Sequence, residues 1–286
     1  MKYRAIVFLI ITAFLWSLGG LLIKLVAWNP VAIAGARSAI ASLLMLALRR
    51  KLRFDWGLAQ MGGAACYAAT VILFVASNKL TTAANAILLQ YTAPIYVACF
   101  SYWFLRERIS KSDLLTIATA IGGMISFFLD DLSKGGLWGN VLAILSGITF
   151  AGTALFLRKQ KDGSPLESVF MGNIGAFLVG LPFMVQSSPN AKGWLWLMLL
   201  GVFQLGFSYV FYAEAIKHVT ALEGILIPVL EPILNPIWVF LLVRERPGKW
   251  AILGGLIVLA SVTMRCLLAL RQNGRQDSEL AAAGHP

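Results

Sequence analysis

Charged residues are scarce in this sequence of 286 residues, because only 13% are Asp, Glu, Lys or Arg. A typical soluble domain has about 25%. Hydrophobic residues reach 59%, and the mean hydropathy is +0.78. A soluble fold cannot cover so much apolar surface with so few charges. The composition therefore excludes a soluble domain, a disordered chain and a collagen-like rod, and it indicates a chain that crosses a membrane several times.

Histidine and cysteine are also rare. The histidines, His218 and His285, lie at a predicted helix boundary and in the C-terminal tail, so a histidine-based metal site is not expected. The cysteines, Cys66, Cys99 and Cys266, lie in apolar stretches without a C-x-x-C pair, which favours small core residues over a disulfide framework. Zinc-protease, serine-hydrolase and P-loop motifs are missing. We therefore expect no enzyme, no metal and no cofactor.

Basic residues outnumber acidic ones by 24 to 13, which gives a net charge of +11. Nucleic-acid binding is one interpretation of such a balance. However, the charges form short clusters between apolar runs instead of lining one face, which favours cationic loops that fix the orientation of a membrane protein. The lipid bilayer, and no nucleic acid, is the expected partner.

Apolar runs of about 20 residues predict membrane-spanning helices. Ten such runs cover residues 5–27, 31–48, 57–77, 82–105, 113–130, 137–157, 166–185, 194–216, 220–243 and 249–270. With a cytoplasmic N-terminus, sixteen Lys and Arg residues lie inside and seven outside, so the positive-inside rule places both termini in the cytoplasm. Residues 271–286 form a polar tail that we expect to be disordered.

An internal duplication relates the two halves of the sequence at an offset of 138 residues. The matched positions are Thr82 with Thr220, Pro94 with Pro232, Lys111 with Lys249, and the Arg-Glu-Arg segments 106–108 and 244–246. We therefore predict an all-α membrane protein of two five-helix repeats, residues 1–134 and 135–270. A second copy of a unit with an odd number of spans enters the membrane from the opposite side, so the repeats are inverted. Inverted repeats favour a transporter with its site between the halves.

These features resemble the drug/metabolite transporter superfamily, in its EamA-type branch of ten spans. The matching segments are residues 14–17, the region of Arg37, residues 80–86 and residues 220–232. The resemblance covers about residues 5–270, and within the superfamily it points most closely to bacterial aromatic amino-acid exporters. It implies that spans 1–4 and 6–9 surround a central cavity, with spans 5 and 10 at the periphery.

Charges inside the predicted spans are candidates for substrate contact, since a charge at the centre of a membrane helix costs about 2.5–3.5 kcal/mol. Arg37 would hold a substrate carboxylate, or it would pair structurally with an acidic residue or with helix carbonyls. Glu231 would meet a substrate amine or carry a coupling proton. Lys79 would guard the external mouth or, like Lys24, extend to the lipid headgroups.

Two further acidic residues have structural interpretations. Glu223 follows Thr220 by three residues and predicts a capping box at a helix start. Glu214 precedes Lys217 by three residues and predicts an ion pair.

Prolines and aromatic residues complete the predicted site. Prolines inside spans free backbone carbonyls, which are tolerated where they line a cavity, although they are also compatible with inherited kinks. The predicted hinges are Pro94, Pro228, Pro232 and Pro236. Aromatic side chains would stack on the substrate, or they would pack the core. The predicted substrate-binding residues are Trp16, Arg37, Tyr67, Phe74, Asn78, Lys79, Gln90, Tyr91, Phe150, Phe207, Tyr212, Glu231 and Asn235.

The sequence thus predicts a transporter of the bacterial inner membrane that exports aromatic or other neutral amino acids by alternating access. These features are compatible with a monomer. Three alternatives stay open: an exporter of cationic drugs that uses Glu231, a passive channel, and a membrane-embedded enzyme.

Overall fold

The computed structural model describes residues 1–49, 52–127, 136–234, 249–250, 253–261, 263–264 and 268, and these residues contain helices and no strand. The helices are α1 (Lys2–Trp16), α2 (Gly19–Leu25), α3 (Pro30–Leu48), α4 (Leu58–Leu80), α5 (Ala83–Gln90), α6 (Ala93–Leu105), α7 (Lys111–Phe127), α8 (Leu137–Lys159), α9 (Pro165–Met184), α10 (Ala191–Leu199), the π-helix η2 (Leu200–Phe207), α11 (Ser208–Ala215), α12 (Ala221–Leu226) and the 3₁₀-helix η3 (Ile227–Leu230).

Six stretches of the described residues are long and apolar enough to cross a membrane. They are Lys2–Leu25, Pro30–Leu48, Leu58–Leu80, Leu137–Lys159, Pro165–Met184 and Ala191–Ala215. They coincide with predicted spans 1, 2, 3, 6, 7 and 8. This confirms an all-helical protein that crosses the membrane several times, whereas the count of ten spans stays a prediction.

The other four predicted spans are helical where the structure describes them. Within residues 82–105 lie α5 and α6, which are separated at Tyr91 and Thr92, and α7 lies within residues 113–130 apart from its first two residues. Residues 221–234 are helical through α12 and η3, and residues 253–261 are helical. The remainder of predicted spans 9 and 10 lies largely outside the described residues.

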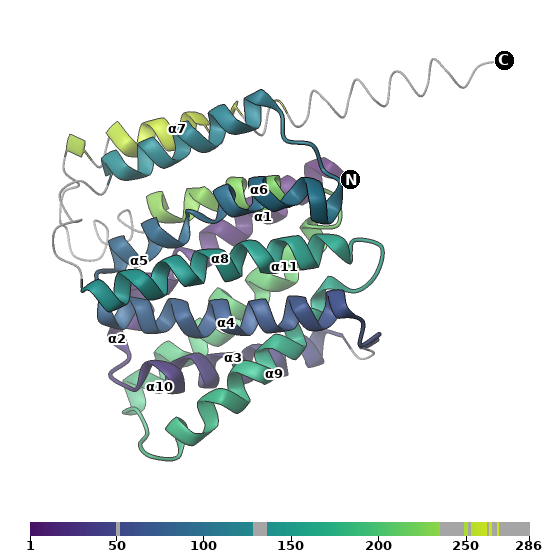
Figure 1. The fold of residues 1–286 in the computed structure, drawn as a ribbon. Coiled ribbons are helices and arrows are strands. Elements are labelled where there is room, and N and C mark those ends of the chain that lie inside the picture. The colour runs from purple at the N-terminus through teal and green to yellow at the C-terminus, as the bar shows by residue number, and fades with distance from the viewer. Residues whose placement is uncertain are drawn as a thin grey trace.

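The helices lie side by side in one bundle (Figure 1). The most extensive packing joins α4 to α8 and α3 to α9, so helices from the first part of the chain interleave with helices from the second. Helix α7 lies at one edge of the bundle beside residues 253–261 (Figure 1), where Ser261 Oγ donates to Thr119 Oγ1 at 2.9 Å. The rest of the bundle is therefore formed by the helices from α1 to α6 and from α8 to η3.

Side-chain caps fix the starts of two related helices. Thr82 Oγ1 accepts from the backbone N–H of Asn85 at the start of α5. Thr220 and Glu223 form a complete capping box at the start of α12, which confirms the predicted box. Because a cap contributes about 1 kcal/mol to helix stability, these threonines define where each helix begins. The two caps lie at positions that the 138-residue offset relates.

Candidate functional site

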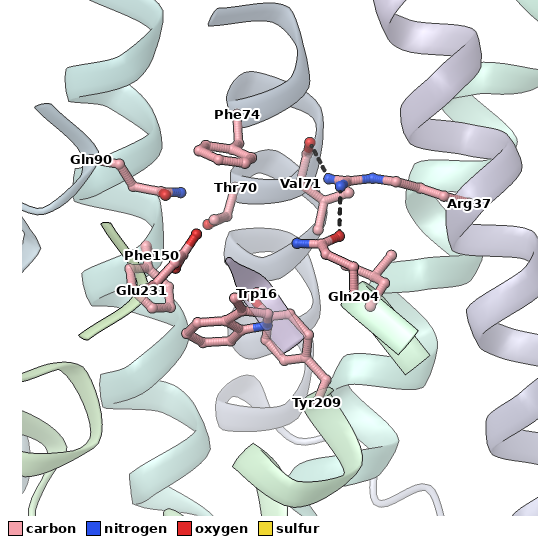
Figure 2. A pocket seen from close by; sticks show the side chains of 11 residues that line it. Trp16, Arg37, Thr70, Val71, Phe74, Gln90, Phe150, Gln204, Tyr209 and Glu231 are labelled. Carbon is pink, nitrogen blue, oxygen red and sulfur yellow. Dashed lines mark hydrogen bonds between the residues drawn. The ribbon is translucent and has the colours of Figure 1, made fainter. Parts of the chain in front are cut away.

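A small cavity lies at the centre of the bundle, between helices of both halves of the chain. It is lined by Trp16, Arg37, Thr70, Val71, Phe74, Gln90, Phe150, Gln204, Leu205, Tyr209 and Glu231 (Figure 2). Its volume is about 30 Å³. Because one water needs about 10–15 Å³ of such space, the cavity in this conformation holds about two or three waters. Helices or side chains must move before a metabolite fits.

Arg37 forms one wall of the cavity. Its guanidinium donates from NH1 to Gln204 Oε1 at 2.9 Å and from NH2 to the carbonyl O of Val71 at 3.2 Å (Figure 2). The side chain is 1% exposed, and its Nε has no hydrogen-bond partner among the residues that the structure describes. In the described part of the chain, no acidic oxygen lies within 4.0 Å of it. Arg37 thus presents a buried positive charge to the cavity.

Gln204 reaches Arg37 from the π-helix η2. Gly201 of this segment lies so close to α3 that a Cβ atom there would come within 2.5 Å of the Ile40 Cβ and 2.9 Å of the Arg37 carbonyl O. Close backbone approach of η2 to α3 therefore brings Gln204 to the guanidinium. Gln204 is not among the predicted site residues, and the signals for this contact in the sequence are Gly201 and a lone amide in an apolar run.

Glu231 forms the opposite wall of the cavity from Arg37 (Figure 2). The carboxylate is 5% exposed, and its Oε2 accepts a hydrogen bond from Tyr91 Oη at 2.7 Å. Pro228 lies in η3, just before Glu231, and its carbonyl O lies 2.8 Å from the same hydroxyl. Tyr91, which directly follows α5, thus holds the Glu231 carboxylate, which directly follows the 3₁₀-helix η3.

Aromatic rings pack between the two charged walls. Trp16 lies between Arg37 and Glu231 in Figure 2, and its Nε1 donates to Ser208 Oγ at 3.0 Å. Its ring centroid lies 5.5 Å from Phe150, 5.0 Å from Tyr209 and 5.3 Å from Tyr212. Such pairs add about 0.5–1.5 kcal/mol each beyond area burial. The rings therefore make a rigid apolar surface at the level of the cavity.

The cavity brings together many of the residues that the sequence predicted for the site. Those that line it are Trp16, Arg37, Phe74, Gln90, Phe150 and Glu231. Tyr67, Tyr91 and Tyr212 are buried immediately behind lining residues: Tyr67 contacts Tyr209 ring to ring at 4.7 Å and donates to Asn173 Oδ1 at 3.0 Å. Thr70, Val71, Gln204, Leu205 and Tyr209 also line the cavity and were not among the predicted site residues.

Other predicted residues lie away from the cavity. Phe207 is half-buried in a separate apolar groove with Phe8 and Phe211. Asn78 is buried near the end of α4, where its Nδ2 donates to the carbonyl O of Phe74 at 3.2 Å. Asn235 and Pro236 are outside the described residues.

The two lysines predicted at helix ends bind backbone carbonyls. Lys79 Nζ donates to the carbonyl O of Val26 at 2.6 Å, and Lys24 Nζ donates to that of Thr81 at 2.9 Å. The positions of Lys24 and Lys79 relative to the lipid headgroups and to an external mouth stay predictions. Lys79 is half-buried and Lys24 is exposed, and both ammonium groups bind carbonyls at the ends of α2 and α4, which have no intrahelical partner.

The prolines predicted as hinges lie next to helix interruptions where the structure describes them. Pro94 lies in the first turn of α6, directly after the break at Tyr91 and Thr92, and Pro228 lies in the first turn of η3. Pro232 follows η3 by two residues. Proline is tolerated in a first turn, because the N–H groups there have no intrahelical partner. Movement at these breaks stays a prediction.

Among the residues that the structure describes, no group of three or more His, Cys, Asp or Glu side chains is placed to hold a metal ion. What the site offers is a buried cation, a carboxylate across the cavity from it, and aromatic surface. Groups of these kinds are chemically suited to binding a small amphipathic molecule by charge and by stacking.

Several proteins of similar sequence are named as transporters. An uncharacterised transporter of Archaeoglobus fulgidus is 26% identical over 196 residues, which cover 68% of this chain and 70% of that protein. The pseudopaline exporter of Pseudomonas aeruginosa is 27% identical over 187 residues, with 63% and 65% covered.

The fold matches that of one crystal structure with a TM-score of 0.80, at 17% identity, over 95% of this chain and 99% of that one. The family comparison matches the chain twice, over residues 3–129 and again over residues 137–265. Both segments match the same family, and together they cover most of the sequence. This chain therefore belongs to the EamA-like transporter family.

Proposed function

We propose that this protein exports small zwitterionic metabolites, with aromatic and other neutral amino acids as the substrate class. The observation that carries the proposal is the placement of Arg37 and Glu231 on opposite walls of one cavity. A guanidinium is suited to a carboxylate and a carboxylate to an ammonium. An amino acid carries both groups on one carbon, with its side chain free to meet the rings of Trp16 and Phe150.

Alternating access is the proposed mechanism. The described cavity is too small for an amino acid, so binding requires an opening toward one side of the membrane and release requires an opening toward the other. Two inverted five-helix repeats, residues 1–134 and 135–270, would exchange conformations to do this. The twofold family match and the helix breaks at residues 91–92 and near η3 support this proposal.

The plasma membrane of a bacterium, with both termini in the cytoplasm, is the proposed location. The excess of Lys and Arg in the loops on one side supports this orientation. Export as the direction of transport is supported by the likeness to a protein named as an exporter.

The test is a counterflow screen of the twenty amino acids with the purified protein in proteoliposomes. We expect saturable exchange of unchanged solute for one or more neutral amino acids. Arg37→Ala at equal expression should weaken apparent binding by about 2–5 kcal/mol, because a buried charge partner is lost. Unaltered exchange by that variant would remove Arg37 from the site.

A cationic drug is the second candidate substrate, because Glu231 lies among aromatic rings that also suit an organic cation. Such a substrate would depend on Glu231 and not on Arg37. Resistance conferred on cells by the wild-type protein, lost in Glu231→Gln and kept in Arg37→Ala, would favour it. Conductance without saturation would instead indicate a channel, and a chemically altered solute would indicate an enzyme.

A further inference from the structure

The guanidinium of Arg37 is held by a neutral side chain where an anion would be the stronger partner. Its bond to Gln204 Oε1 measures 2.9 Å, and Gln204 itself is only 5% exposed. The second bond goes to a backbone carbonyl, and within the described part of the chain Nε has no partner. A buried arginine without a counter-ion is costly, so the site is poised for an anion that brings its own charge.

The amide of Gln204 is placed tightly beside a second helix. A Cβ atom at Gly19, the first residue of α2, would come within 3.0 Å of Gln204 Nε2 and 3.3 Å of its Cδ. The segment that carries Gln204 is the π-helix η2, and π-helical turns are frequent at functional sites. The wide π turn and the missing Cβ of Gly19 together let the carboxamide lie in the cavity wall next to Arg37.

We propose that Gln204 is a specificity-determining residue that occupies the carboxylate position at Arg37 until substrate replaces it. The inference rests on the proposed function and names the group of the substrate that Arg37 recognises. An amide oxygen has the shape of a carboxylate oxygen but no charge. A substrate carboxylate therefore forms the stronger, charge-assisted bonds and displaces the amide. An amine without a carboxylate has no group that can displace it.

The variants Gln204→Glu and Gln204→Ala should change the affinity for a substrate carboxylate in opposite directions. Gln204→Glu supplies a permanent carboxylate at Arg37, so the site repels an incoming carboxylate and leaves Glu231 to bind amines. Gln204→Ala removes the competitor, so carboxylate binding becomes tighter. If Gln204 were instead a direct ligand of the substrate, the alanine variant would bind more weakly.

The experiment measures equilibrium binding of two probes to the purified full-length protein in detergent. The probes are L-phenylalanine and phenethylamine, which differ only in the carboxylate. We expect Gln204→Glu to weaken phenylalanine binding at least tenfold and to strengthen phenethylamine binding, and Gln204→Ala to tighten phenylalanine binding several-fold. Phenylalanine binding that is unchanged in Gln204→Glu, or weaker in Gln204→Ala, would overturn the proposal.

A second arm needs no ligand. The midpoint temperature of unfolding is measured for Gln204→Glu, for Arg37→Gln and for the double variant. We expect Gln204→Glu to raise the midpoint temperature when Arg37 is present, because the new carboxylate forms an ion pair with it. In the Arg37→Gln background we expect Gln204→Glu to lower the midpoint temperature, because the buried carboxylate has no cation beside it. Equal effects in both backgrounds would overturn the proposal. If the wild-type protein bound neither probe, the proposed function would fail for aromatic amino acids, and this arm would still test whether the side chain at position 204 occupies the anion position at Arg37.

Discussion

Tyr91 and Glu231 meet where two helices of the bundle are interrupted. Tyr91 Oη lies 2.7 Å from Glu231 Oε2 and 2.8 Å from the carbonyl O of Pro228, and it shares its hydrogen between them. Tyr91 follows α5 in the first family-matched part of the chain, and Glu231 follows η3 in the second. One hydroxyl thus joins the two parts beside the cavity.

Loss of that hydroxyl should destabilise the protein. Tyr91→Phe keeps the ring but leaves the buried Glu231 carboxylate without this donor, which costs about 1–3 kcal/mol. The free energy of unfolding of the detergent-solubilised protein is the measurement. Tyr3→Phe is the matched control, since Tyr3 is 68% exposed and its change should be within about 0.5 kcal/mol. Equal effects of the two substitutions would contradict the assigned role of the hydroxyl.

A side chain at position 201 should destabilise the protein. Gly201→Ala forces a methyl group against Ile40 on α3, and overpacking of this kind costs about 1–3 kcal/mol. Relief of this clash also moves η2, and with it Gln204, away from Arg37. We therefore expect Gly201→Ala to change substrate affinity as well as the free energy of unfolding. Gly122→Ala serves as the control, since a Cβ there meets no atom of the described residues within 4 Å and alanine stabilises a helix by about 0.5–1 kcal/mol relative to glycine. A Gly201→Ala protein with the same free energy of unfolding as the wild type would refute the close contact between η2 and α3.

An ion pair joins the same two parts of the chain at the end of α8. Arg158 Nε donates to Glu107 Oε1 at 2.7 Å, and Arg158 NH1 donates to the carbonyl O of Lys217 at 2.7 Å. The other oxygen of Glu107 accepts from the backbone N–H of Ala221, the first residue of α12, at 3.0 Å. The carboxylate therefore binds two groups from the second part at once.

Neutralising this carboxylate should cost more than neutralising an exposed one. We expect Glu107→Gln to lower the free energy of unfolding by about 1.5–3 kcal/mol, because charge-assisted bonds are lost in a mostly buried place. Glu214→Gln removes the partner of Lys217, a contact whose acid is 43% exposed, and should cost only about 0–1 kcal/mol. Chemical denaturation of both variants tests the difference, and the reverse order would show that the Glu107 contact is not a structural link.

Local sequence rules predicted much of this molecule. Spacing along one helix gave the capping box of Thr220 with Glu223 and the ion pair of Glu214 with Lys217, which the structure has at 2.9 Å. Both depend on residues three positions apart, and helix geometry fixes such contacts without any tertiary information.

Contacts between distant helices could not be predicted in this way. Gln204 lies 167 positions from Arg37, and the π turn shifts the face that each residue of η2 presents, so a 3.6-residue period does not assign it to the cavity. The same shift explains why Phe207, an aromatic residue inside a span, faces an outer groove. Lys24 and Lys79 bind carbonyls 57 and 53 positions away, which no local pattern indicates.

The central claim is that a five-helix unit was duplicated and that the second copy lies upside down relative to the first. Single cysteines at Ser110 and Pro247, in a protein whose three native cysteines are changed to serine, can be labelled with a membrane-impermeant maleimide in right-side-out vesicles. We predict that the cysteine at position 247 reacts in intact vesicles and that the cysteine at position 110 reacts only after permeabilisation. Reaction of both from one side of the membrane would contradict the inverted arrangement and the transport mechanism built on it.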